Sequence, residues 1–268
     1  MIDSHAHVWR LGENGCAWPT PDLKPIHRDF VVDDLRVVAN AAGVNGVILV
    51  QSQASLADTE WLLRLASDRL IAAVVGWIDF AAPDASSSIR ALAQAKVLRG
   101  LRPMVQDLES DWYDAPELGA AFATMSELNL VLDALVRPKH LPSLRRLAER
   151  YPQLGIVIDH GAKPDFDDLG GWGEEISAVA RLPNVTCKLS GLLTELPQSA
   201  PPQAIKPAFD ILWNCFGSER LIWGSDWPVL TLVAEYNAWL TQVQELVPAE
   251  HHTAVFDGNA RRVYGVAA

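Results

Sequence analysis

The first chemically suggestive spacing in the chain is a pair of histidines, His5 and His7, near the N-terminus. They lie in an apolar, strand-like run, and side chains two residues apart on a strand point to the same face. Two imidazoles that converge in this way can bind a divalent metal ion or stabilise an anionic transition state. The alternative is that both histidines are structural and only form hydrogen bonds. For an isolated pair this alternative is favoured, but a position on the first strand of a barrel pattern favours the functional interpretation.

Two further candidates follow later apolar runs. Asp226 comes after the run at 221–224, where a carboxylate could ligate a metal and take a proton from attacking water. Its alternative is an N-cap for the next helix, which Pro228 would suit. His160 follows the run at 155–159 and could polarise a carbonyl or donate a proton. Its alternative is a histidine that caps the strand end.

Three cationic side chains could orient a substrate. Arg102 lies near the end of the fourth apolar run and is a candidate anion clamp. Lys163 could pair with a substrate carboxylate or remain a solvated loop lysine. Lys188 lies inside an apolar run, where an unpaired charge costs much free energy. It therefore requires a salt-bridge partner or a role in the site, and the sequence leaves both open.

The chain has ten tryptophans, and four of them fall near the same predicted face: Trp9, Trp18, Trp77 and Trp227. Flat aromatic walls suit sugar rings, although core filling is the commoner use of tryptophan. His140, His251 and His252 fall in helical or loop contexts, and we expect them to lie on the surface. Three widely spaced cysteines argue against a disulfide framework or a cysteine zinc site.

Eight apolar runs alternate with amphipathic stretches and set the frame for these residues. Many of the runs lack strict alternation, as expected of strands buried on both faces of a parallel sheet. A doubly wound open sheet is the structural rival, but the first strand is not followed by a G-x-G-x-x-G motif. The pattern predicts one α/β domain over residues 1–268, a (β/α)8 TIM barrel with a long loop at about 11–32. The runs span residues 2–8, 46–50, 71–77, 97–104, 128–136, 155–159, 185–189 and 221–224.

The bulk composition narrows the class of protein. The chain has 268 residues, 49% of them hydrophobic, and a net charge of −11 without a basic stripe, so we expect no nucleic-acid partner. It contains no apolar stretch of about 18 residues and no signal-peptide pattern, which predicts no membrane association and a cytoplasmic location. Neither a G-x-S-x-G elbow nor a P-loop is present, so serine-hydrolase and kinase chemistry have no support.

Four motifs in a fixed order carry a family resemblance: HAH at 5–7, DHGAKP at 159–164, KLSG at 188–191 and GSDWP at 224–228. Together they resemble the amidohydrolase superfamily, and more narrowly its amidohydrolase-related branch of sugar-acid lactonases and pyrone-dicarboxylate lactonase. Shorter segments at 50–51, 75–79, 99–102 and 258–265 are similar to that branch as well. The resemblance spans nearly the whole chain.

The resemblance implies a distorted (β/α)8 TIM barrel with the site at its C-terminal mouth. It places His5, His7 and Asp226 at metal-binding positions and His7, His160 and Asp226 at catalytic positions, with Asp226 as general base. The candidate substrate-binding residues lie near several of the predicted strand ends: Arg102, Lys163, Lys188, Trp77, Trp9 and Gln51. The fifth strand lacks a histidine, which argues against a two-metal centre. Two cofactor alternatives stay open, one divalent ion (zinc or manganese) or no metal.

The reaction implied is the opening of a sugar-acid lactone by water that Asp226 activates, so the partner is a small-molecule lactone. A metal-dependent decarboxylase of the same superfamily is the first alternative. A barrel that binds a sugar acid without catalysis is the second. The sequence leaves a homo-oligomer open.

Overall fold

Eight β-strands form one parallel sheet in the computed structural model, which describes residues 1–267. The strands follow one another around the sheet in chain order, and each paired neighbour is parallel. Each strand matches one of the predicted apolar runs. Their bounds are β1 (Ile2–Ala6), β2 (Gly46–Val50), β3 (Ile71–Gly76), β4 (Leu98–Leu101), β5 (Val131–Ala134), β6 (Ile156–Ile158), β7 (Val185–Leu189) and β8 (Leu221–Trp223).

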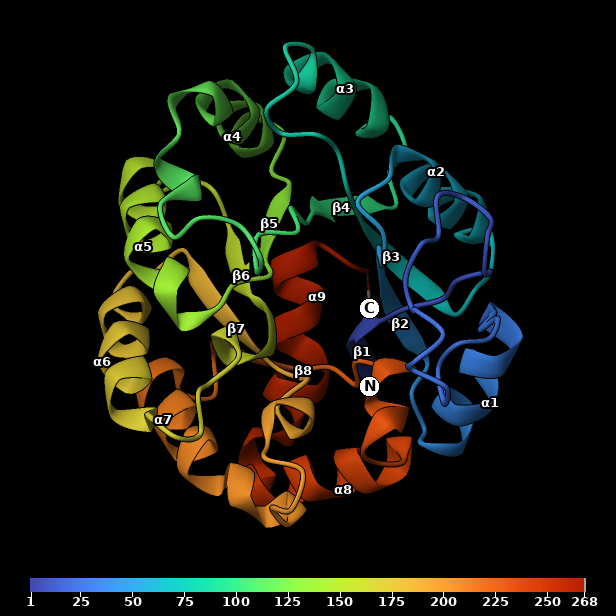
Figure 1. Cartoon of the computed structure of the whole chain (residues 1–268), viewed down its shortest axis with the longest axis vertical. Coiled ribbons are helices and arrows are strands. Elements are labelled where there is room, and N and C mark those ends of the chain that lie inside the picture. Colours follow the sequence, from blue (N-terminus) through green and yellow to red (C-terminus); the bar gives the residue numbers. More distant parts are fainter. Residues whose placement is uncertain (268) are drawn as a thin grey trace.

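An α-helix follows every strand, and the helices α1–α8 surround the strands as a ring (Figure 1). This arrangement confirms the predicted (β/α)8 barrel. The helices are α1 (Val32–Ala41), α2 (Leu56–Leu65), α3 (Ala85–Leu92), α4 (Gly119–Glu127), α5 (Leu141–Arg150), α6 (Leu169–Ala180), α7 (Lys206–Phe216), α8 (Tyr236–Leu246) and α9 (Asn259–Tyr264). No helix among residues 1–267 is long and apolar enough to cross a bilayer.

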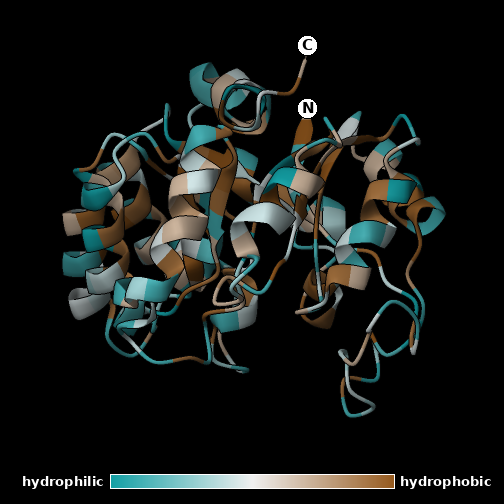
Figure 2. Cartoon of the chain, turned by 90° about the horizontal axis from the view of Figure 1, so that it is seen from above, coloured by the Kyte–Doolittle hydropathy of each residue, from teal (hydrophilic) through white to brown (hydrophobic). Residues whose placement is uncertain are grey.

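The strands are apolar on both faces because each face packs against a different part of the core. In β2, Val47 and Leu49 belong to the core beneath the helices, while Ile48 and Val50 belong to the core inside the barrel. Successive side chains of a strand point to opposite faces, so both sets are buried and the sequence shows no alternation. Figure 2 shows the hydrophobic strands in the interior and hydrophilic residues on the outer helices.

The barrel closes between β1 and β8 just beyond the ends of the strands. Ala6 forms a parallel bridge with Trp227, and the His7 amide donates to the Trp227 carbonyl over 2.7 Å. The Asp226 amide donates to the His5 carbonyl, also over 2.7 Å. Two hydrogen bonds therefore bring His5 of β1 and the adjoining His7 next to Asp226, although 219 residues separate His7 from Asp226.

The C-terminal helix α9 covers the opposite end of the barrel. Ala260 and Tyr264 pack in the barrel interior with Ile2 and Val131, the first residues of β1 and β5. In the view of Figure 1, α9 lies inside the ring of helices α1–α8. The C-terminal mouth is thus left as the end at which side chains of the strand ends can meet a ligand.

Residues 7–31 connect β1 to α1, and hydrogen bonds hold this connection at two places. Trp9 and Phe30 exchange two backbone hydrogen bonds of 2.8 and 3.0 Å. The Gln53 side chain accepts from the Ala17 and Trp18 amides and donates to the Trp18 carbonyl over 2.7 Å. The connection is therefore held at the mouth, with Trp18 in a defined position.

The prediction of a surface position is wrong for His140, which is fully buried. Its Nδ1 accepts from the Arg137 amide over 3.0 Å, and its Nε2 lies 3.1 Å from the Leu108 carbonyl. The partner Leu108 lies 32 residues away, so the local sequence carries no sign of this burial. His251 and His252 are half-buried.

Candidate active site

The strand ends at the mouth carry a cluster of unusual backbone conformations. His160, Ala162, Lys163 and Asp226 have positive φ angles of 54°, 62°, 52° and 59°. Side chains other than glycine adopt this left-handed region at a cost of about 1–3 kcal/mol, and such residues gather at functional sites. Their clustering beyond β6 and β8 singles out this face of the barrel for a site.

Three side chains at and just beyond the ends of β1 and β8 converge at the floor of the mouth. His5 Nε2 lies 3.1 Å from His7 Nε2, His7 Nε2 lies 3.3 Å from Asp226 Oδ1, and His5 Nε2 lies 3.7 Å from the same oxygen. Nitrogen ligands of a tetrahedral zinc ion lie about 2.0–2.1 Å from the metal, and therefore about 3.3 Å apart. The three atoms thus have the spacing of metal ligands.

The hydrogen bonds of His7 support the same conclusion. His7 Nδ1 lies 2.7 Å from the Val50 carbonyl, which can only accept, so Nδ1 carries the proton. Where Nε2 carries no proton, its lone pair faces the Asp226 carboxylate. Two acceptors that face each other require a cation or an extra proton between them. The set His5, His7 and Asp226 therefore fits one divalent ion.

His160 completes the cluster from the other side of the pocket. Its Nε2 lies 3.9 Å from Asp226 Oδ1, and its Nδ1 is hydrogen-bonded to the Ser190 hydroxyl at 2.8 Å. Gly191, at φ +59°, allows this approach, because a Cβ there would lie 2.5 Å from His160 Nδ1. Burial lowers the pKa of His160, so its imidazole is neutral at neutral pH.

Asp226 is ionised in this environment. Burial alone would raise its pKa, but His160, His7 and His5 outweigh burial and hold the pKa below its usual range. The carboxylate faces the histidines, and the 3-10 turn that follows has no side-chain cap. The N-cap alternative for Asp226 is therefore wrong.

A buried ion cluster, formed by Lys188, Arg102, Asp133 and Asp159, lies beneath the histidines and Asp226. Lys188 Nζ lies 2.5 Å from Asp133 Oδ2, 3.1 Å from Asp159 Oδ1 and 3.1 Å from His5 Nδ1. Arg102 adds a second cation, 3.4 Å from Asp159 Oδ2. Lys188 therefore has both a salt-bridge partner and a contact with the site. Asp159 was not among the predicted site residues, although it follows a buried strand just as Asp226 does.

The mouth holds a cavity of about 300 Å³ above this cluster. Five of the predicted site residues line it: His7, Arg102, His160, Lys163 and Asp226. Its other lining residues are Trp18, Ser52, Met104, Gln106, Asp107, Leu135 and Val229. The pocket thus combines His7, His160 and Asp226 with several apolar side chains.

Three other predicted residues, Gln51, Trp9 and Trp77, do not line this pocket. Gln51 donates to the Arg102 carbonyl over 2.9 Å, and Arg102 Nη2 donates to the Gln51 carbonyl. Trp9 is buried against Trp18 and donates to the Arg28 carbonyl. Trp77 is half-buried and outside the lining. Trp18 is therefore the tryptophan that meets the pocket.

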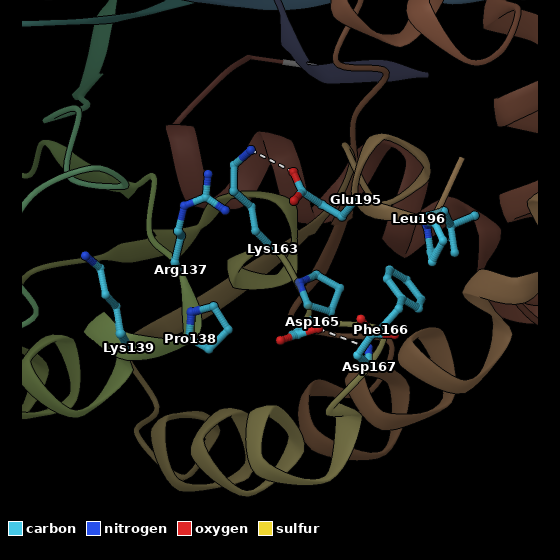
Figure 3. A pocket seen from close by; sticks show the side chains of 11 residues that line it. Arg137, Pro138, Lys139, Lys163, Asp165, Phe166, Asp167, Glu195 and Leu196 are labelled. Atoms are coloured by element: carbon cyan, nitrogen blue, oxygen red, sulfur yellow. Dashed lines mark hydrogen bonds and ion pairs between the residues drawn. The ribbon is translucent and has the colours of Figure 1, made fainter. Parts of the chain in front are cut away.

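A larger cavity of about 590 Å³ lies beside the mouth (Figure 3). Lys163 lines both cavities and pairs with Glu195 over 2.8 Å, as the dashed line in Figure 3 shows. Arg137, Lys139 and Asp165 also line the larger cavity, but none of the clustered histidines does. His7, His160 and Asp226 therefore belong to the smaller cavity.

Comparison with known proteins gives this site a family. The amidohydrolase family model matches residues 2–266. An L-fucono-1,5-lactonase from Burkholderia ambifaria is 41% identical over 276 residues, covering 99% of this chain and 95% of that protein. An L-fucono-1,5-lactonase from Burkholderia multivorans is 33% identical, covering 99% and 96%.

A solved structure agrees with this assignment. The crystal structure of an amidohydrolase from Burkholderia multivorans with bound zinc is 32% identical, covers 99% of both chains and superposes with a TM-score of 0.93. The names of both lactonases agree with the hydrolase class predicted from the strand-end motifs. On the order of its motifs, its barrel and these matches, the chain belongs to the amidohydrolase family.

Proposed function

We propose that this chain hydrolyses the internal ester of a sugar-acid lactone, and that its substrate is a six-membered lactone of the L-fucono type. One observation carries the proposal. Asp226 Oδ1 lies within 3.9 Å of three imidazoles at the floor of a pocket, in a chain 41% identical to an L-fucono-1,5-lactonase.

The size and lining of the pocket support a single sugar ring as the ligand. About 300 Å³ lies at the lower end of the range for small-molecule sites. Ser52, Gln106 and Lys163 offer hydrogen-bond partners for ring hydroxyls. Trp18 and Val229 add apolar contact area. A fuconolactone carries a methyl group in place of the hydroxymethyl group of other hexonolactones, and such a lining favours the methyl group.

Asp226 acts as the general base in this proposal. Its ionised carboxylate accepts a proton from a water molecule, whose oxygen attacks the lactone carbonyl carbon. The bond from that carbon to the ring oxygen then breaks, and Asp226 returns the proton to the ring oxygen. One water is consumed, and the product is an open-chain hydroxy acid that releases a proton at neutral pH.

The other residues of the cluster polarise and hold the carbonyl. His160 can donate from Nε2 to the carbonyl oxygen while the Ser190 hydroxyl donates to Nδ1. A zinc or manganese ion bound by His5, His7 and Asp226 would supply a Lewis acid at the same carbonyl. Lys163 orients a hydroxyl from the rim of the pocket. Arg102 holds Asp159 and His5 beneath the pocket.

Acid release in weak buffer tests the proposed reaction. The panel contains the 1,5-lactones of L-fuconic, L-galactonic and D-gluconic acid together with 2-pyrone-4,6-dicarboxylate. We expect acid release to be fastest with L-fucono-1,5-lactone. Release no faster than the spontaneous rate for every lactone, with zinc or manganese added or after chelation, would overturn the proposal.

A further inference from the structure

The reactive cluster consists of His5, His7, His160 and Asp226. A series of buried contacts joins it to the closed end of the barrel. Its centre is Lys188 of β7, whose side chain is completely buried. Lys188 contacts His5 Nδ1 on the side of the mouth and Asp133 of β5 on the other side. In the ion cluster, the two cations Lys188 and Arg102 balance two carboxylates, Asp133 and Asp159. The ion cluster therefore carries no net charge.

Tyr264 of α9 contacts the ion cluster from the end opposite the mouth. Its hydroxyl lies 2.8 and 3.0 Å from the two carboxylate oxygens of Asp133. Its ring lies beneath Lys188, with Nζ 5.4 Å from the ring centroid. Tyr264 therefore touches two members of the cluster, yet it lies at the far end of the barrel from Asp226 and the pocket lining.

The geometry makes the position of His5 depend on these contacts. His5 Nδ1 lies 3.1 Å from Lys188 Nζ and 3.3 Å from Asp159 Oδ1, so these two groups fix the ring. Lys188 is in turn held by Asp133, and the Tyr264 hydroxyl bridges both oxygens of Asp133. Without that hydroxyl, one Asp133 oxygen loses its partner and the carboxylate is free to rotate. Lys188 then shifts, and His5 loses its fixed orientation towards the pocket.

We propose that Tyr264 is a positioning residue for the reactive cluster, which holds His5 in place through Asp133 and Lys188. The C-terminal helix thereby serves the reaction as well as closing the barrel. This inference rests on the proposed lactonase function for its kinetic readout, but its spectroscopic readout is independent of any substrate.

The test compares Tyr264→Phe with Tyr151→Phe. Both variants remove one tyrosine hydroxyl and keep the ring; the Tyr151 hydroxyl contacts the Gly119 carbonyl on the outer helical layer. Hydrolysis of L-fucono-1,5-lactone gives kcat and KM. Nitrogen-15 labelling of the histidines gives the ring signals of His5, with His140 as an internal reference.

For Tyr264→Phe we expect kcat to fall about tenfold, while KM stays within about twofold of the wild-type value. A tenfold loss is in the range known for residues that orient a ligating side chain without binding the ligand themselves. We also expect the His5 ring signals to shift while those of His140 stay in place. Tyr151→Phe should change neither. A Tyr264→Phe protein with unchanged kcat and unchanged His5 signals would overturn the inference, even if its melting temperature falls.

Two further arms separate the causes of failure. If the wild-type protein hydrolyses no lactone, the proposed function fails, while the His5 signals still decide the inference. If Tyr264→Phe does not fold, Asp133→Asn breaks the next contact of the same series and repeats the test. Unchanged His5 signals in folded Asp133→Asn would then overturn the inference.

Discussion

His7 has one ring nitrogen bonded to the backbone and the other directed at Asp226. His5 adds a second imidazole nitrogen 3.1 Å away. In a buried site, His7 Nε2 and the Asp226 carboxylate are an unfavourable pair when both act as acceptors, because neither supplies a donor to the other. A bound cation removes that cost, which is the physical reason to expect a metal here.

The metal expectation can be measured without substrate. After dialysis against a chelator, we expect zinc titration by calorimetry to show one ion bound per chain. His7→Ala should weaken the affinity at least about tenfold because it removes one ligand. His252→Ala is the matched control, since His252 bonds the Gln244 and Val247 carbonyls away from the site. Equal zinc affinity in all three proteins would contradict this assignment.

The buried His140 contributes to the pH dependence of stability. Burial lowers the pKa of His140 in the folded state, whereas the unfolded chain binds the proton near pH 6.5. The unfolded state therefore binds more protons as the pH falls below about 6.5, and stability is lost in that direction.

His140→Gln removes this titrating group and keeps one donor and one acceptor. Between pH 7.5 and 5.5 we expect the wild-type protein to lose more of its free energy of unfolding in urea than His140→Gln does. Parallel pH profiles of the two proteins would show that His140 does not titrate as its burial implies.

At the scale of elements, the strands were predicted from apolar runs because both of their faces are buried. The bounds were less accurate where apolar residues serve another element. The run at 128–136 was expected to be one strand, but β5 spans only Val131–Ala134. Leu128 caps α4, Asn129 takes a positive φ of 54°, and the Leu130 amide donates to the Met125 carbonyl. A helix end and a strand start thus share one apolar run.

The connection between β1 and α1 sets one wall of the pocket through Trp18. Gln53 holds this segment by hydrogen bonds to the backbone of Ala17 and Trp18. We expect Gln53→Ala to raise KM about fivefold, the equivalent of roughly 1 kcal/mol for a lost hydrogen bond, with kcat little changed.

Ser55→Ala is the matched control for this change. Ser55 bonds the Asn14 carbonyl in the same connection but does not contact Trp18 through its hydroxyl. Steady-state kinetics with L-fucono-1,5-lactone distinguish the two. An equal rise of KM in both variants, or none in Gln53→Ala, would show that Gln53 does not place the pocket wall.

At the scale of the whole molecule, the barrel brings together groups that the sequence keeps apart. The motifs at the strand ends predicted the mouth and its histidines, because every parallel strand ends at the same face. The support beneath them was not predicted: 131 residues separate Tyr264 from Asp133, and 55 separate Lys188 from Asp133. The sequence indicated that Lys188 needs a partner. It could not reveal that Asp133, Asp159 and His5 all contact it, because strand register decides those contacts.

In the proposed function, Asp226 drives lactone opening at the barrel mouth. The most direct test compares initial rates of acid release from L-fucono-1,5-lactone for the wild-type protein, Asp226→Asn and Asp165→Asn. Asp165 lines only the neighbouring cavity and serves as the control. We predict that Asp226→Asn lowers the rate at least about 100-fold, with an intact thermal unfolding transition, and that Asp165→Asn retains the wild-type rate. Turnover retained in folded Asp226→Asn would contradict the claim.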